Sequence, residues 1–339
     1  MCKTDQILII QTAYIGDVLL TTPLIQACRD HFPDAAIDIM VIPAAGPLVE
    51  THPALRQVIL YDKRKSQSGC RGVIAMAGRL RRTQYTLVLT PHRSLRSAVL
   101  AWCSRARIRI GFDTSSGVLL LTHRVRYDRT RHEVERNLSL LTALGIVTGP
   151  KRPQIYATAA DCKVVDQRLE GLAAPGQPLI AIAPGSIWAT KRWPAASFRQ
   201  LAERIVGAGW PVVWIGGTQD RPLCEEISRG RAGRWLNGAG QFSFRQSAEV
   251  IRRAALLVSN DSAPLHAASA MGTPTVAIFG PTVTEFGFGP LSEVATVVQR
   301  DLACRPCSIH GGRTCPIGTH ACMTGITVEQ VFNEIVRMV

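Results

Sequence analysis

Short apolar runs rich in Ile and Val alternate with longer amphipathic stretches through all 339 residues of the chain. Short buried strands separated by helical periodicity are typical of βαβ units and a parallel sheet. The predicted strands span residues 6–11, 36–41, 58–61, 86–90, 108–111, 179–183, 211–215, 256–259 and 275–279. The predicted helices span residues 17–31, 94–103, 159–172, 195–208, 221–228, 243–255 and 264–271.

This periodic pattern pauses at residues 149–153, where Gly and Pro crowd together. A chain of this length has room for two domains of about 150 residues, each with its own core. We therefore predict an α/β domain at residues 1–155 and another at 156–339, the latter with a Cys-rich segment at 304–322. The two domains are expected to face each other across a cleft, with ligands at the carboxyl ends of the strands.

Positive charge is concentrated in one region of the chain. Lys and Arg number 39 and Asp and Glu 25, a net charge of +14, and residues 51–150 alone hold 18 basic and 5 acidic side chains. Such a patch predicts an anionic partner, which could be a phosphorylated substrate, an acidic membrane surface or nucleic acid. The hydrophobic fraction of 46% excludes a disordered chain.

The sequence shows no export signal, because only four apolar residues, Ile7–Ile10, follow the charged N-terminus. The longest uncharged run, 262–284, is interrupted by Gly and Pro and is not typical of a membrane span. Scattered cysteines suit a reducing compartment. These are Cys2, Cys28, Cys70, Cys103, Cys162 and Cys224. We expect a cytoplasmic protein, either soluble or peripheral to a membrane.

Asp17 is the first candidate for chemistry. It follows Gly16 at the point where the first predicted strand gives way to a helix, and groups at this end of a strand face the ligand in α/β domains. The alternative is that Asp17 is only the N-cap of that helix, since Asp favours this position.

Two further strand ends in the second half carry polar loops. Residues 184–194 read PGSIWATKRWP, with small residues, hydroxyls and two cations, and residues 258–268 read VSNDSAPLHAA, with a helix opening near Pro264. Backbone donors, a helix N-terminus and a mobile ammonium are what a diphosphate site needs. The alternatives are a solvated basic loop, Asp261 or Ser262 as a helix cap, and His266 as a core histidine. A third loop, 214–220, could hold a base or ribose.

Together these segments resemble the ADP-heptose:lipopolysaccharide heptosyltransferase family. The resemblance rests on residues 16–19, 184–186, 191–194, 259–266 and 279–282, which occur in the family's order along nearly the whole chain. Residues 91–96, residues 109–112 and the Cys-rich tail are most similar to the members that add the second inner-core heptose. The family has the GT-B architecture of two Rossmann-like α/β domains, and its members are inverting transferases.

The resemblance implies ADP-L-glycero-D-manno-heptose as donor, bound mainly by the C-terminal domain. A phosphorylated Kdo-lipid A core is the implied acceptor, at the N-terminal domain, with no catalytic metal, no cofactor and no nucleic acid. It implies that Asp17 is the general base, which favours base over helix cap, and that Lys191 neutralises the departing diphosphate. The implied donor-binding residues are Ser186, Lys191, Gly216, Gly217, Asp220, Asp261, Ser262, Ala263 and His266.

Arginine predominates among the basic residues between Arg79 and Arg136, as suits bidentate contacts with phosphate or carboxylate. Arg93 and Arg96, at a strand end and the following helix start, are the predicted acceptor contacts. About half of the other arginines are expected only to solvate a face.

The Cys-rich segment has a spacing compatible with a tetrahedral zinc site, although its second pair is not C-x2-C. A reduced or adventitiously oxidised loop is the alternative. The residues concerned are Cys304, Cys307, Cys315 and Cys322, with His310 and His320 nearby.

The sequence therefore predicts a heptosyltransferase at the inner face of the inner membrane, which a basic N-terminal domain contacts. One rival is another GT-B transferase with a different sugar nucleotide or acceptor. The other is a basic nucleic-acid-binding protein with a zinc site, which the lack of an aromatic platform disfavours.

Overall fold

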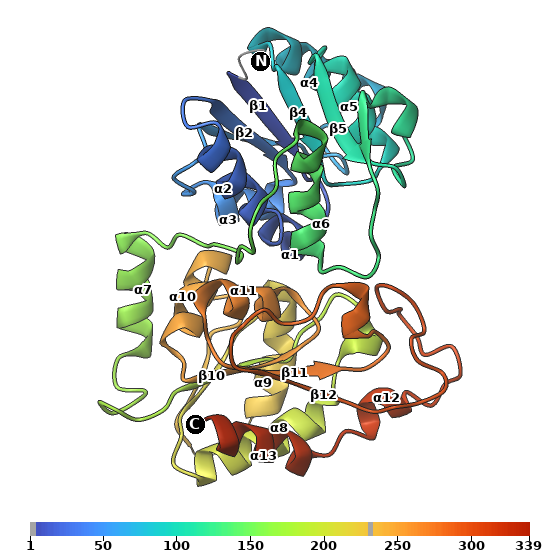
Figure 1. Cartoon of the computed structure of the whole chain (residues 1–339). Helices are drawn as coiled ribbons and strands as arrows, with labels where there is room; N and C mark the ends of the chain where they lie inside the picture. Colours follow the sequence, from blue (N-terminus) through green and yellow to red (C-terminus); the bar gives the residue numbers. More distant parts are fainter. Residues whose placement is uncertain (1–4, 230–232) are drawn as a thin grey trace. The chain divides into compact units, whose positions relative to one another are not determined.

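The computed structural model describes residues 5–229 and 233–339. The chain divides into two compact units, Met1–Tyr156 and Ala157–Val339, each built around its own parallel sheet (Figure 1). The predicted α/β class with two Rossmann-like domains is thus confirmed.

The described part of the first unit forms a six-stranded parallel sheet in the order β3-β2-β1-β4-β5-β6. Its central strand β1 pairs with β2 on one side and β4 on the other, so that Ile7 lies between Ile37 and Leu87. The strands are β1 (Gln6–Ile10), β2 (Ala36–Val41), β3 (Gln57–Leu60), β4 (Leu87–Thr90), β5 (Ile108–Phe112) and β6 (His123–Val125).

Helices cover both faces of this sheet, because its strands are apolar on both sides. Met76 and Leu80 of α4 and Leu100 of α5 pack on Leu8 and Val88, and α2 packs against α6. The helices are α1 (Ile15–Leu19), α2 (Thr22–His31), α3 (Gly46–Val49), α4 (Gly69–Thr83), α5 (Leu95–Cys103) and α6 (Glu133–Ser139).

One helix prediction is wrong in its continuity. The helix expected at residues 17–31 is two helices, α1 ending at Leu19 and α2 beginning at Thr22. Pro23 explains the break, because its ring clashes with the carbonyl four residues earlier, which belongs to Leu19, and it has no N–H to donate.

The second unit repeats the topology of the first. Its described residues form a six-stranded parallel sheet in the order β12-β11-β10-β7-β8-β9, in which β8 and β9 are added on one side of the centre and β11 and β12 on the other. The strands are β7 (Ile180–Ala183), β8 (Val212–Trp214), β9 (Trp235–Asn237), β10 (Leu256–Asn260), β11 (Thr275–Phe279) and β12 (Ala295–Gln299).

Two layers of helices enclose this second sheet. Phe198 of α8, Ile227 of α9 and Ile335 of α13 share one core with Ile182 and Val258, whereas α11 packs with α10 on the other face. The helices are α7 (Ala159–Leu169), α8 (Ala195–Gly207), α9 (Arg221–Ser228), α10 (Phe244–Arg253), α11 (Ala263–Met271), α12 (Ala321–Thr324) and α13 (Val328–Met338).

Candidate active site

In each unit most of the predicted site residues follow the two strands between which the strand order reverses; Gly216, Gly217 and Asp220 follow the neighbouring strand β8 instead. In the first unit these strands are β1 and β4, and in the second they are β7 and β10. Loops at such a reversal diverge to opposite faces of the sheet and leave a crevice, which is where α/β proteins bind ligands. We describe each unit by itself.

Asp17 is the third residue of α1, and Tyr14, not Asp17, is the N-cap. Asp17 is therefore not the N-cap, although its carboxylate takes part in capping the helix from the third position. The half-buried carboxylate reaches back and accepts a hydrogen bond from the Tyr14 backbone N–H (Oδ2, 3.1 Å). This bond holds the carboxylate at the mouth of the helix, after the carboxyl end of β1.

Asp17 belongs to a cluster of charges with Lys63 and Glu133, two residues that were not predicted from the sequence. The Asp17 charge opposes the lowering of the Lys63 pKa, which is caused first by burial and then by neighbouring arginines. Burial raises the pKa of Glu133, and the nearby Asp17 charge adds to this rise. Glu133 accepts hydrogen bonds from Tyr127 and Arg136, both at 3.0 Å. The site thus holds two carboxylates in different environments.

The two predicted acceptor arginines lie at the end of β4 and the start of α5, both half-buried. The Arg93 guanidinium lies 3.9 Å from the centre of the Tyr127 ring, and Arg96 donates to the Lys63 carbonyl (3.0 Å). Tyr127 and Lys63 also flank the Asp17 cluster, so the structure brings both arginines into the same group. Arginine stacked on an aromatic ring keeps its edge N–H groups for a phosphate or carboxylate.

A histidine for which sequence reasoning assigned no role lies in the same group. His92 Nδ1 is 3.0 Å from the hydroxyl of Thr12, at the end of β1, and 3.0 Å from the hydroxyl of Ser97, on α5. Burial, aided by the charges of Lys63 and Arg93, lowers the pKa of His92 to about 4, so its ring is neutral at pH 7. The imidazole therefore ties the β1 and β4 loops together.

In the second unit a buried ion pair joins two of the predicted residues. Lys191 Nζ lies 2.6 Å from Asp261 Oδ2, with the side chains 12% and 7% exposed. Thr282, which follows β11, donates its hydroxyl to the same oxygen at 2.6 Å. Lys191 follows β7 and Asp261 follows β10, so the pair lies directly at the reversal of strand order. Thr282 was not among the predicted site residues.

Asn260, the last residue of β10, holds the loop after β7 in place. Its side-chain N–H donates to the Pro184 carbonyl (2.8 Å), and its oxygen accepts from the Trp193 backbone N–H (3.1 Å). The amide is fully buried. Asn260 thus fastens both ends of the loop that carries Lys191 to the end of β10.

The predicted nucleoside loop meets the Ser186 loop through one carboxylate. Gly217 donates its backbone N–H to Asp220 Oδ2 (2.9 Å), and burial raises the pKa of Asp220. A Cβ built on Gly185 would lie 2.3 Å from Asp220 Oδ1, and one on Gly216 2.8 Å from Asp220 Cβ. Only glycine therefore allows these loops to approach so closely. Ser186, next to Gly185, is buried and accepts a hydrogen bond at its carbonyl from Arg192.

The remaining predicted donor residues open helix α11. Ser262 occupies the N-cap position, with its hydroxyl 3.4 Å from that of Ser259, and Ala263 begins the helix. Asp261 is engaged by Lys191 and not in capping. Helix α11 begins two residues after Asp261, so the positive end of its dipole lies near this residue, and Pro264 suits the first turn because no N–H is needed there. His266 is buried within the first turns of α11.

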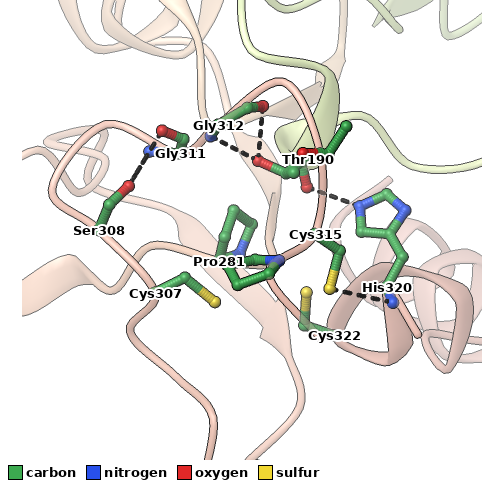
Figure 2. Close-up of a pocket in the computed structure, with 11 residues that line it drawn as sticks. Thr190, Pro281, Cys307, Ser308, Gly311, Gly312, Cys315, His320 and Cys322 are labelled. Carbon is green, nitrogen blue, oxygen red and sulfur yellow. Dashed lines mark hydrogen bonds between the residues drawn. The ribbon is translucent and has the colours of Figure 1, made fainter. Parts of the chain in front are cut away.

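The Cys-rich segment lies against the turn that carries Lys191. Cys307, Cys315 and Cys322 line a pocket of about 160 Å³ together with Thr190 and His320 (Figure 2). Over residues 5–229 and 233–339, no three His, Cys, Asp or Glu side chains are placed to share a metal ion. Nor is any helix in this described part long and apolar enough to cross a bilayer.

Comparison with known proteins shows the family to which this chain belongs. Residues 73–316 match the family described as "Glycosyltransferase family 9 (heptosyltransferase)". The chain belongs to this family, and it is therefore a glycosyltransferase of the heptosyltransferase class. The resemblance noted in the sequence is thus confirmed, and so is the prediction of an enzyme.

Two curated relatives and two solved structures illustrate the similarity. The chain is 30% identical to lipopolysaccharide heptosyltransferase 3 of Escherichia coli K12 (79% of this chain, 80% of the relative) and 27% identical to lipooligosaccharide heptosyltransferase 2 of Haemophilus influenzae (86% and 88%). A family 9 glycosyl transferase from Veillonella parvula superposes with TM-score 0.89 at 24% identity, covering 100% of this chain and 98% of that one. An E. coli heptosyltransferase solved with ADP-2-deoxy-2-fluoro heptose gives TM-score 0.72 at 19% identity, covering 98% and 100%. The fold is thus that of the GT-B heptosyltransferases.

Proposed function

We propose that this enzyme transfers L-glycero-D-manno-heptose from ADP-heptose to the inner core of lipopolysaccharide, with a phosphorylated heptosyl-Kdo-lipid A as acceptor and with inversion at the anomeric carbon. The observation that carries the proposal is the Lys191–Asp261–Thr282 cluster beside the start of α11. An ammonium next to a helix N-terminus suits a diphosphate. That the related E. coli enzyme was solved with an ADP-heptose analogue supports the choice of donor.

In the proposed reaction, the Asp17 carboxylate takes the proton of an acceptor hydroxyl as that oxygen attacks the anomeric carbon of the heptose. The bond from this carbon to the diphosphate oxygen breaks, and ADP leaves with the electron pair. Lys191 and the amide groups at the start of α11 stabilise the charge that develops on the diphosphate. Asp261 holds the sugar hydroxyls, and Gly216, Gly217 and Asp220 lie beside the nucleoside. A single displacement of this kind inverts the anomeric configuration.

The test of the base is Asp17→Asn, with Asp34→Asn, an exposed carboxylate of the same unit, as matched control. Loss of general base catalysis lowers kcat by about 100- to 10,000-fold, while the affinity for ADP measured by calorimetry stays unchanged. The control variant retains full turnover. Full turnover by Asp17→Asn would exclude the base assignment, and NMR of the product anomer tests inversion directly.

The choice of substrate needs its own assay, because relatives of both the second and the third heptosyltransferase type are similar to this chain. ADP-heptose, other ADP-sugars, UDP-sugars and GDP-sugars are offered with core acceptors truncated after each successive sugar. The proposal predicts ADP release only with ADP-heptose and the heptosyl-Kdo-lipid A acceptor. Turnover with a longer core alone would support the rival GT-B transferase.

For the membrane contact, the exposed face of α4 and α5 is the best-supported surface. Residues 63–112 contain twelve Lys and Arg and no Asp or Glu. Helix α4 packs against α5, and Arg81 donates to the Cys103 carbonyl (2.9 Å), which places exposed Trp102 beside the end of α4. Ile74 and Trp102 are 69% and 53% exposed. Exposed apolar side chains among arginines are typical of a surface that docks on anionic lipid.

Flotation with vesicles of phosphatidylethanolamine and phosphatidylglycerol tests this contact. Ile74→Ser/Trp102→Ser should reduce binding, and Val147→Ser, which alters an exposed apolar residue elsewhere in the unit, should not. Binding should weaken as salt rises, because exposed charges are screened beyond about 10 Å at 0.1 M ionic strength. Equal binding by all three proteins would reject this face, and tight binding to nucleic acid instead would favour the remaining rival.

A further inference from the structure

The Cys-rich segment, residues 304–322, binds Thr190, the residue next to Lys191. It forms hydrogen bonds with the backbone N–H, the carbonyl and the hydroxyl of Thr190. The Thr190 hydroxyl accepts from Gly312 N–H (2.8 Å), and both the Thr190 N–H and its hydroxyl donate to the Gly312 carbonyl (3.1 and 3.0 Å). The Thr190 carbonyl accepts from His320 Nε2 at 2.7 Å. Figure 2 shows the bonds of the Thr190 hydroxyl to Gly312 and of its carbonyl to His320, and Thr190 is only 5% exposed.

The same segment lies on the aliphatic part of Lys191. A Cβ added to Gly311 would lie 3.1 Å from Lys191 Cγ and 3.3 Å from its Cε, so glycine at this position leaves room for the lysine stem beside it. Gly311 has a φ of +83°, which glycine adopts without strain. Ser308 fixes it, because its hydroxyl accepts from the Gly311 N–H and donates to the Gly311 carbonyl. The Cys-rich segment therefore lies along one side of the lysine stem.

The other half of the ion pair is held from the same segment. Arg305 donates to the Thr282 carbonyl (2.8 Å), and the Cys307 backbone N–H donates to the Pro281 carbonyl (3.0 Å). Thr282 is the residue whose hydroxyl binds Asp261. The segment therefore binds the neighbours of both Lys191 and Asp261, which lie 70 residues apart in the chain.

One thiol is connected to this arrangement. Cys315 Sγ accepts the backbone N–H of His320 (3.4 Å), the residue whose ring binds Thr190. That hydrogen bond and others from the same turn hold the pKa of the Cys315 thiol below its usual value. The turn from Cys315 to His320 thus sets the position of the imidazole.

We propose that the Cys-rich segment is a clamp. Its residues Gly312 and His320 bind Thr190, and through Thr190 they position the neighbouring Lys191 for the leaving diphosphate. Thr190 and His320 are then positioning residues that act through Lys191. This inference rests on the proposed role of Lys191 in diphosphate departure. It follows from geometry, because Lys191 ends a three-residue turn (Ala189–Lys191), and contacts that fix this turn limit the positions that the long side chain can take.

A double-mutant cycle tests the clamp. We compare kcat and KM for ADP-heptose in the wild-type protein, in Thr190→Val, in Lys191→Met and in the combined variant. A misplaced lysine lowers kcat/KM of Thr190→Val by about 10- to 100-fold. In the Lys191→Met background the same change should cost less than about twofold. Thr190→Ser, which keeps the hydroxyl, should recover most of the rate.

The outcomes separate the two proposals. Equal losses from Thr190→Val in both backgrounds would overturn the clamp, and so would an unchanged rate for Thr190→Val. An unchanged rate for Lys191→Met would instead refute the proposed role of Lys191.

If Thr190→Val does not fold, His320→Leu and His320→Gln, which keeps a side-chain N–H donor, give the same comparison. Ile309→Ala, an exposed residue of the same segment, is the matched control and should behave as wild type.

Discussion

Breaking the Lys191–Asp261 ion pair is the most informative test of the second unit. At 2.6 Å between Nζ and Oδ2, the Coulomb attraction is on the order of 6 kcal/mol at an effective dielectric constant of about 20. Much of this offsets the desolvation of two charges that are 12% and 7% exposed. Removing one partner leaves the other charge buried, which costs about 3–5 kcal/mol.

In Lys191→Met, the Asp261 carboxylate keeps the hydrogen bond that it accepts from the Thr282 hydroxyl. A hydrogen bond to a charged group contributes about 1.5–3 kcal/mol, so we expect the lower end of the range, a loss of about 3 kcal/mol in the free energy of unfolding. In Lys191→Met/Asp261→Asn the buried charge is gone, and most of this loss should be recovered.

Urea unfolding followed by tryptophan fluorescence measures this loss, because five of the six tryptophans, all except Trp102, belong to the second unit. Circular dichroism of the same samples reports on both units, so a separate transition of the first unit is recognised. Lys163→Met, at an exposed position of α7, is the control and should change stability by less than about 0.5 kcal/mol. The reasoning is refuted if Lys191→Met matches this control, or if the double variant is no more stable than Lys191→Met.

Two further predictions concern pH and the nucleoside loop. Burial lowers the pKa of His52 and of His92 to about 4, from 6.5 for an ordinary imidazole, so the unfolded chain binds more protons between these pH values. The Tm of the first unit should therefore fall as the pH falls from about 6.5 to about 4, and calorimetry of His52→Gln should show a shallower decline; a parallel decline would contradict this origin. Gly185→Ala places a methyl group against the Asp220 carboxylate and should weaken ADP binding in calorimetry, whereas Gly207→Ala, where the added Cβ meets nothing within 4 Å, should leave it unchanged.

The sequence determined the class of fold and the ends of the strands that carry the chemistry. Apolar runs of β length are visible because each central strand is buried on both faces, and the strand predicted at 275–279 and the helix at 221–228 have the observed bounds. The edge strands β6, β9 and β12 were missed. Their residues are partly exposed, so they lack the continuous apolar run of the central strands. Helix α4 was missed too, because Gly and Arg interrupt its apolar positions.

Tertiary structure alone decided which site residues meet. No local pattern pairs Lys191 with Asp261, brings Glu133 near Asp17, or joins Thr190 to His320, 130 residues further along the chain. Hydrophobic periodicity reports only which face of an element is buried. Contacts between loops depend on strand order and register, which bring the carboxyl ends of distant strands to one edge of a sheet. The Cys-rich segment shows this most clearly, since its spacing is compatible with zinc whereas its hydrogen bonds go to Thr190, next to the lysine of the proposed donor site.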